Sequence, residues 1–450
     1  MKAKTVSFMS FAWLLAACAT QSYAPQPLAP ADSAEAFRAR TLNDAGLGAV
    51  EVWGLPQLTQ AALRLHPDIE LARAQWRAAQ AAETTAGQKP NPIISGSGEH
   101  HSRANGISPW TLTLGIDIPI ETHGKREARI EQATALSAAA KLDIAQAAWQ
   151  VRRRLRSRLL ELYAIRQQAA QLHREADLRA QIVALLEARL AAGLVGGTDL
   201  ADARLQLQKT RSAMETEAAR AAEAHAALAA GIGLPAAALV NVPLSFAPFE
   251  LDSIQLPPED GQRAALLNRL EIRKSLAGFE AAEARLKLEV AKQYPDFSLA
   301  PGYSWDQGDN RWSLGVSLIL ALLNKNEGPI AEARAQREVQ AQQFNALQAA
   351  VIGEQSQALA GWQAAQAVIA KARKLAAAQQ ARLAQTQSQF DAGYADRLEL
   401  TSAQLELNSA EAAVLAARLQ AQHALGKLED AVQQPLDGSA PLPKMPEEKP

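Results

Sequence analysis

The 450-residue sequence lacks most of the features that mark an enzyme or a nucleic-acid-binding protein. It contains no glycine-rich phosphate loop, no G-x-S-x-G motif and no zinc-ligand spacing, so it predicts no catalytic residue, no metal site and no cofactor. Its single cysteine excludes a disulfide within one chain. The formal net charge of −1 indicates no strongly acidic or basic partner.

One segment is basic, but it does not indicate nucleic-acid binding. Its arginines lie within a predicted helix, at Arg152, Arg153, Arg154, Arg156 and Arg158. Recognition of nucleic acid needs a basic patch together with groups that read or stack on bases. We therefore interpret the run as a solvated helix face and expect no nucleic-acid partner.

Aromatic residues are only 5% of the chain, whereas Ala, Gln, Arg, Glu and Leu are abundant, a composition typical of long helices or coiled coils. No proline or glycine occurs between Lys125 and Ala192, a stretch that would span about 100 Å as a helix. A second stretch, Ile330–Ala392, is interrupted only by two glycines. Glycine turns at Gly193 and Gly393 should lead into shorter returning helices, which we place at Asp199–Ala230 and Arg397–Val432.

The chain contains a long internal repeat, because the pattern of Ile69–Asp202 reappears in Ile272–Glu399. Trp110–Leu114 aligns with Trp312–Val316, and both copies predict the order helix, strand, strand, long helix. This is a duplicated half-protein rather than a short solenoid unit. We place a signal peptide at 1–17, a tether at 18–54, the first repeat at 55–233, a proline-rich link at 234–262, the second repeat at 263–434 and a disordered tail at 435–450.

Three segments of about ten residues alternate between apolar and small or polar side chains. They are Trp110–Ile120, Asp296–Trp305 and Arg311–Leu322, whereas a fourth segment, Pro92–His101, alternates poorly. Period-two alternation of this length is typical of strands in a membrane β-barrel, with lipid outside and water inside. A soluble sandwich with one buried face is the simpler alternative.

Four strands per chain are too few for a closed membrane barrel, because such barrels begin at about eight strands. An open sheet edge is not tolerated in the hydrocarbon region. If the strands enter a membrane, the chain must therefore oligomerise to close its sheet.

The N-terminal segment predicts export and lipid attachment. Lys2 and Lys4 precede a short apolar run that is too short to span a bilayer, as in a signal peptide. The sequence Leu15-Ala16-Ala17-Cys18 resembles a bacterial lipoprotein box, in which the thiol of Cys18 would receive the lipid. By the same analogy, Ala19 after the cysteine favours the outer membrane. An ordinary signal peptide with a chance cysteine is the alternative.

Over roughly Leu55–Gln434, the duplicated unit with glycine hairpin turns resembles the TolC-like outer membrane factors of tripartite efflux pumps. The strand-to-helix junctions Pro119–Arg126 and Leu322–Ala333 resemble those of the heavy-metal branch, the cobalt–zinc–cadmium type. The resemblance implies a mainly α fold with a small β part and a homotrimer whose three chains form one twelve-stranded barrel. It also implies a helical tunnel that binds a periplasmic adaptor protein, through hairpin tips around Arg189, Gly193 and Gly393, and an inner-membrane pump.

Members of this family close the periplasmic end with acidic rings beyond the hairpin turn. The matching positions are Asp396 and Glu399 in the second repeat, with Asp199 and Asp202 in the first. Threefold symmetry would turn each carboxylate into a ring that attracts cations. The alternative is helix capping, because Asp199 and Asp396 are predicted at helix N-termini, where a negative charge is favoured.

Two histidine positions could suggest a metal site, but their spacing argues against one. In Glu99-His100-His101, adjacent strand residues point to opposite faces and cannot easily share one ion, so we interpret the segment as a strand rim. His123 has no histidine or cysteine nearby in the sequence.

The leading functional hypothesis is a passive export duct in the bacterial outer membrane, lipid-anchored and extending into the periplasm, with metal cations as the expected cargo. The same fold could instead export drugs or polypeptides. A non-conducting coiled-coil scaffold lipoprotein would explain the helices and Cys18 but not the alternating strands. An enzyme is the weakest alternative.

Overall fold

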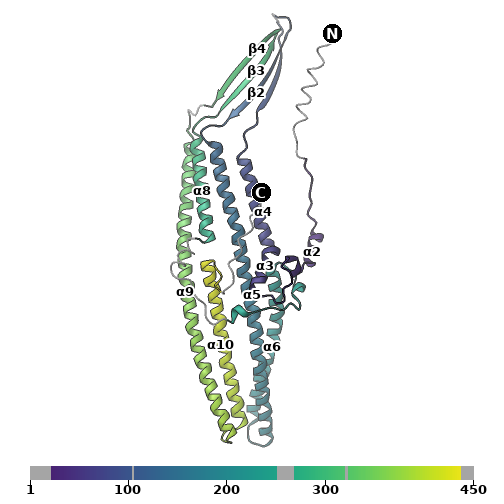
Figure 1. The fold of residues 1–450 in the computed structure, drawn as a ribbon, viewed down its shortest axis with the longest axis vertical. Helices are drawn as coiled ribbons and strands as arrows, with labels where there is room; N and C mark the ends of the chain where they lie inside the picture. The colour runs from purple at the N-terminus through teal and green to yellow at the C-terminus, as the bar shows by residue number, and fades with distance from the viewer. Residues whose placement is uncertain (1–21, 104–105, 251–267, 320–322, 437–450) are drawn as a thin grey trace. The chain divides into compact units, whose positions relative to one another are not determined.

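The computed structural model describes residues 22–103, 106–250, 268–319 and 323–436, and this part of the chain divides into two compact units. The first unit ends at Arg40 and contains helix α2 (Pro30–Arg38), which buries no residue. The second begins at Thr41 and contains the sheet and the long helices (Figure 1). Cys18, the predicted signal peptide and residues 437–450 of the predicted tail lie outside the described residues.

The second unit contains one succession of elements twice. The first copy comprises α4 (Pro67–Ala86), β1 (Ile93–His100), β2 (Trp110–Ile120), α5 (Lys125–Ala191) and α6 (Gly197–Ile232). The second comprises α8 (Leu270–Ala291), β3 (Phe297–Asp306), β4 (Asp309–Leu318), α9 (Glu327–Asp391) and α10 (Arg397–Val432). A mainly helical fold with a small sheet is thereby confirmed, whereas the trimer and the repeat boundaries 55–233 and 263–434 stay predictions.

The long helices α5 and α9 have 67 and 65 residues, and each is packed against neighbouring helices along its length. Helix α5 contacts α4, α6, α8 and α10, and α9 contacts α8 and α10. Such contacts are required because helical propensity alone does not hold a helix of this length. Among the described residues, no helix has both the length and the apolar character needed to cross a bilayer.

Both long helices end in the same glycine turn. At the end of α5, Gly193 adopts a φ of 76°, and the backbone N–H of Leu194 donates to the carbonyl of Arg189 at 2.9 Å. At the end of α9, Gly393 has a φ of 78°, and Tyr394 N–H donates to the Gln389 carbonyl at 2.8 Å. Glycine enters this left-handed region without a steric penalty, so the sequence signal for the two hairpins had a definite physical basis.

Several predicted boundaries differ from the structure. The start of α9 at Ile330 is wrong, because Gly328 and Pro329 fit in its first turn, where backbone N–H groups need no intrahelical acceptor. Helix α6 is two residues longer at each end than the predicted segment, Asp199–Ala230. The predicted bounds of α10 agree with the structure.

The four strands form one antiparallel sheet in the order β1-β2-β3-β4, so the β2–β3 pairing joins the two repeats. Strands β1 and β4 are its edges. The bounds predicted for β2 agree with the structure, whereas β4 begins and ends earlier than Arg311–Leu322. Its early start follows from a two-residue turn in which Gln307 and Gly308 have positive φ, which allows Asp306 and Asp309 to pair directly.

The strand register collects the apolar side chains on one face of the sheet. Leu114 lies opposite Tyr303, which in turn lies opposite Trp312. This face is not covered within the described chain, since Trp312 is 82% exposed and Leu314 is 72% exposed. The poor alternation of β1 also has an explanation, because Gly96 and Gly98 occupy this face opposite Leu114 and Leu112.

The largest buried core lies where α3 (Leu55–Leu65), α5 and α6 meet. The segment after α6, which includes η2 (Ala236–Leu239) and η3 (Ala247–Phe249), adds Leu239 and Phe249, both fully buried. Residues 42–54, which we placed in the tether, also contribute to this core through η1 (Leu42–Ala45) and Trp53. These residues are therefore structural rather than a free tether.

Candidate functional site

The turns that join α5 to α6 and α9 to α10 carry the predicted entrance residues, at the ends of α5 and α9 remote from the sheet (Figure 1). Asp396 is the N-cap of α10 and accepts a hydrogen bond from the backbone N–H of Glu399 at 2.9 Å. The Glu399 carboxylate accepts one from the Asp396 N–H at 3.0 Å, which completes a capping box. Arg189 of α5 also forms an ion pair with Asp396.

Asp396 is held in its ionised form. The backbone N–H of Glu399, and secondly the guanidinium of Arg189, lower the pKa of the Asp396 carboxyl below its ordinary value. Hydrogen bonds to a carboxylate favour its charged state. The capping interpretation therefore holds for Asp396, and the capping geometry keeps a fixed negative charge at the tip of the second hairpin.

Asp199 does not occupy the cap position that the sequence suggested. The N-cap of α6 is Gly196, and Asp199 lies in the first turn. Asp199 and Asp202 are both exposed on the first hairpin.

The two hairpin tips touch each other within one chain. Leu398 of α10 packs against the small core formed by Val183, Leu186, Leu200 and Leu207 of the first hairpin. Leu194 and Tyr394, one in each turn, are 74% and 87% exposed. The described tips thus combine one cross-hairpin ion pair with apolar side chains that face solvent.

The structure separates the two strand histidines as predicted. His100 packs edge-on against Trp110 with ring centroids 4.9 Å apart, whereas His101 Nε2 lies 2.9 Å from the hydroxyl of Thr111. His123 instead stacks on Tyr294, with ring centroids 3.7 Å apart. Within the described chain, no three His, Cys, Asp or Glu residues are grouped as metal ligands.

The interpretation of the arginine run as a solvated face is wrong for two of its members. Arg152 and Arg156 of α5 are only 3% and 4% exposed. Both point toward Glu429 of α10, with N···O distances of 3.3 Å for Arg152 and 3.0 Å for Arg156. Glu429 itself is 1% exposed, so three charged side chains are buried together between the two repeats.

This contact joins positions 277 residues apart, so sequence spacing could not have revealed it. The sequence did contain one indication of the buried charges, which is a difference between the equivalent helices α6 and α10. Helix α6 has alanine at positions 229 and 230, where α10, at the same distance from its start, has Glu429 and Asp430.

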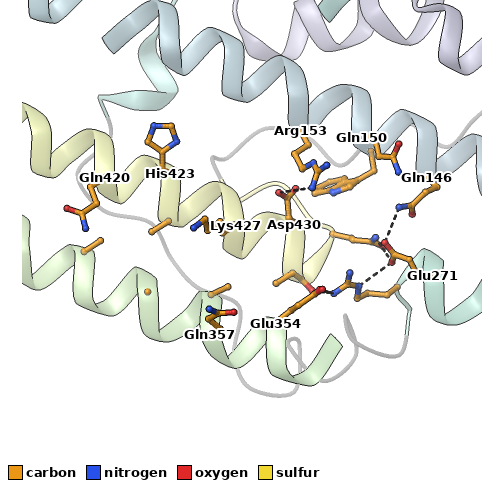
Figure 2. Close-up of a pocket in the computed structure, with 18 residues that line it drawn as sticks. Gln146, Gln150, Arg153, Glu271, Glu354, Gln357, Gln420, His423, Lys427 and Asp430 are labelled. Carbon is orange, nitrogen blue, oxygen red and sulfur yellow. Dashed lines mark hydrogen bonds and ion pairs between the residues drawn. The ribbon is translucent and has the colours of Figure 1, made fainter. Parts of the chain in front are cut away.

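Beside this cluster lies a polar cavity of about 710 Å³, shown in Figure 2. Its wall is built by α5, the start of α8, α9 and the last turns of α10. Glutamine side chains are prominent in the lining: Gln146, Gln150, Gln357, Gln420 and Gln433. Ligand pockets are usually lined by apolar groups, so this lining is unlike that of a typical small-molecule site.

Two long helical hairpins and a four-stranded antiparallel sheet with an exposed apolar face define a TolC-like channel fold. The outer membrane protein VceC of Vibrio cholerae superposes with a TM-score of 0.69 at 22% identity, covering 84% of this chain and 95% of VceC. The structure of CusC gives a TM-score of 0.69 at 18% identity, covering 92% of this chain and 99% of CusC. At these identities the likeness shows the fold alone.

The sequence matches the outer membrane efflux protein family over residues 58–234 and 262–432, and the chain belongs to this family. This is a family of efflux proteins rather than of enzymes. The cobalt-zinc-cadmium resistance protein CzcC of Cupriavidus metallidurans is 25% identical over 236 residues, which are 51% of this chain and 55% of CzcC. The chain thus matches only about half the length of this relative.

Proposed function

We propose that this protein is the outer membrane channel of a tripartite efflux pump. The sheet carries the argument, because it combines an exposed apolar face with two open edges, β1 and β4. Open edges are incompatible with lipid, so further copies of the chain must pair with them. Three copies would give twelve strands around one pore, with the helical hairpins extending the duct into the periplasm.

The oligomeric state tests this arrangement. We expect the full-length protein in mild detergent to have the protein mass of three chains, measured by light scattering with correction for bound detergent. A monodisperse monomer with full strand content would contradict the proposal, because its sheet edges would then be stable without partners.

We propose heavy-metal cations as the exported substrate, which rests on the resemblance to CzcC and the two strand-to-helix junctions. Cells that express the chain with its adaptor and pump should tolerate cobalt, zinc and cadmium better than cells that lack the chain alone. Toxic dyes and antibiotics are the matched controls. Protection against these compounds without protection against metals would assign the duct to drugs instead.

We propose that Asp396 and Glu399 form an acidic ring at the periplasmic entrance, with Asp199 and Asp202 contributing from the first hairpin. Replacing both residues of the second hairpin, Asp396→Asn with Glu399→Gln, should reduce selectivity for cations over anions and weaken block by polyvalent cations. Asp177→Asn, an exposed substitution within α5, is the control. Unchanged reversal potentials and block in the double variant would leave these residues as helix caps only.

The hairpin tips around Arg189, Gly193 and Gly393 are the proposed docking points for the adaptor protein. A photoreactive residue at exposed Leu194 or Tyr394 should crosslink to the adaptor, whereas one at Leu136, near the sheet end of α5, should not. Equal crosslinking at all three positions would contradict docking at the tips.

We also propose that Cys18 carries a lipid that anchors the protein to the outer membrane. Cys18→Ser should abolish incorporation of labelled fatty acid, and persistent labelling would overturn the assignment. Channel activity need not be lost in this variant, because the sheet could still insert.

A further inference from the structure

Asp430 lies in the last turn of α10, on the wall of the polar cavity (Figure 2). Its carboxylate accepts a hydrogen bond from the side chain of Trp149 and lies 3.9 Å from the guanidinium of Arg153, both on α5. The Asp430 side chain is 29% exposed, so water in the cavity can exchange protons with it. One carboxyl group therefore connects the end of the second hairpin to the long helix of the first repeat.

The position disfavours a negative charge in three ways. Burial in the cavity wall is the largest, and the adjacent carboxylate of Glu429 adds repulsion. The C-terminal end of a helix also carries the negative end of its dipole. Burial first, and then Glu429, raise the pKa of Asp430 to about 6, although Arg153, the hydrogen bond from Trp149 and Arg156 all act to lower it.

The charged groups that α8 and α9 present to the cavity are paired with one another. Arg269 at the start of α8 forms ion pairs with Glu271 at 3.3 Å and with Glu354 of α9 at 3.0 Å. Burial alone would raise the pKa of Glu271, but its hydrogen bonds and Arg269 lower it. Glu271 therefore stays ionised in the range in which Asp430 titrates.

The remaining charged groups lie on α5 and on α10 itself. From α5, Arg152 and Arg156 are both engaged with Glu429. On α10, Lys427 also lines the cavity, and burial, together with the charges of Arg156 and Lys427, lowers the pKa of His423. His423 therefore loses its charge at a lower pH than a free imidazole does, whereas Asp430 gains its charge at a higher pH than a free carboxyl does.

We propose that Asp430 is a proton-controlled connection between α10 and α5, whose neutral form keeps the end of the second hairpin packed and whose ionised form favours opening of the cavity. The direction follows from linkage. A carboxyl that binds its proton more tightly in the packed arrangement than in water must, when protonated, stabilise that arrangement. Loss of the proton removes this preference, even though Arg153 partly compensates the new charge.

The mobility of the last turns of α10 tests the proposal in the full-length protein. Hydrogen exchange of residues 423–432, corrected for the intrinsic pH dependence of exchange, should become about tenfold faster between pH 5 and 8. A shift of about two pKa units corresponds to about a hundredfold over the full titration, and roughly half of it lies below pH 5, where a free carboxyl already ionises. Asp430→Asn, which keeps the size of the side chain but cannot ionise, should show slow exchange at both pH values.

Two further variants make the test specific. Arg153→Gln removes the nearby cation that lowers the pKa of Asp430, so the transition should move to higher pH. Asp177→Asn, on an exposed part of α5, should behave as the unmodified protein. A corrected exchange rate that does not change with pH in the unmodified protein, or one that still changes in Asp430→Asn, would overturn the proposal. Neither outcome depends on whether the protein conducts ions.

Discussion

The ends of α6 and α10 have the same helical backbone but are attached to the long helix α5 in different ways. Each helix has 36 residues and follows a glycine turn. The end of α6 is packed by fully buried Leu228 and Ile232, together with Phe249 from the segment that follows. The end of α10 also packs Leu425 and Leu428 in an apolar core with α9, but toward α5 it is held by the buried charges around Glu429, and it adjoins the polar cavity.

The difference shows that duplicated halves can keep one shape while the forces that hold them diverge. Apolar packing has no dependence on protonation, and its strength follows the area removed from water. Buried charges are stable only as a complete set, because each ion needs its partner to offset desolvation. The second hairpin is therefore the half whose attachment can respond to pH, and single substitutions should separate the two kinds of attachment.

The largest expected effect on stability is at the end of α10, where the buried charges around Glu429 lie. Glu429→Gln removes the carboxylate that pairs with both Arg152 and Arg156, and removing one partner of a buried ion pair costs about 3–5 kcal/mol. Chemical denaturation of the purified protein should show this loss. Glu411→Gln, whose exposed carboxylate lies 3.9 Å from Arg174, should change stability by no more than about 0.5 kcal/mol. Equal effects of the two substitutions would show that the buried cluster has no special role.

At the apolar end, Leu228→Ala removes a fully buried side chain from α6 and should cost about 2–4 kcal/mol, with no dependence on pH. Leu205→Ala, at a position 52% exposed on the same helix, should cost much less. Denaturation at pH 5.5 and 7.5 checks both statements. If the loss of stability in Leu228→Ala depended on pH, the ends of α6 and α10 would not differ in their response to pH.

A smaller effect on stability is expected for substitution of Asp430, and the raised pKa determines whether stability rises or falls. The pKa is raised to about 6 in the folded protein, so the group stabilises the fold when protonated and this contribution fades as pH rises toward 6 and beyond. At pH 7.5, Asp430→Asn should therefore raise stability by on the order of 1 kcal/mol, a figure reduced for partial exposure. Below pH 4 the variant and the unmodified protein should be equally stable. If Asp430→Asn were less stable than the unmodified protein at pH 7.5, the predicted sign would be wrong.

The smallest change in stability is expected at the hairpin tips. Arg189→Ala breaks an exposed pair with Asp396, and such pairs contribute about 0.2–1 kcal/mol. Melting temperature should barely move. Arg204→Ala, which breaks an ion pair between α6 and Glu187 within the first hairpin, is the control. If the ion pair between Arg189 and Asp396 restrains the entrance, the open probability of the channel should rise in Arg189→Ala and stay unchanged in Arg204→Ala.

Local patterns were sufficient to predict much of this fold. Strand β2 and helix α10 were located to the residue, because alternation and the turn at Gly393 are properties of short segments. Errors arose where two local signals compete, as at Pro329, which ends most helices but is accepted in a first turn. The four residues predicted to line the entrance lie in the first turns after the two glycine turns, although the cap of α6 is Gly196 rather than Asp199. Their role at an entrance stays a prediction.

The buried cluster could not be predicted in the same way. The spacing of the arginines in α5 looks the same whether they meet water or Glu429, and only the packing of α10 against α5 decides between the two. A charged side chain in a long helix is usually solvated, so the general expectation pointed away from the correct answer. Comparison of α6 with α10 inside this one sequence was the more informative signal.

We propose that several copies of this chain close their sheets into one conducting pore. The most direct test is the ionic current through planar bilayers after addition of the purified full-length protein. We predict discrete, long-lived current steps that prefer cations over anions. Protein that binds the bilayer as a stable oligomer yet never produces a current step would contradict the claim and favour a non-conducting scaffold.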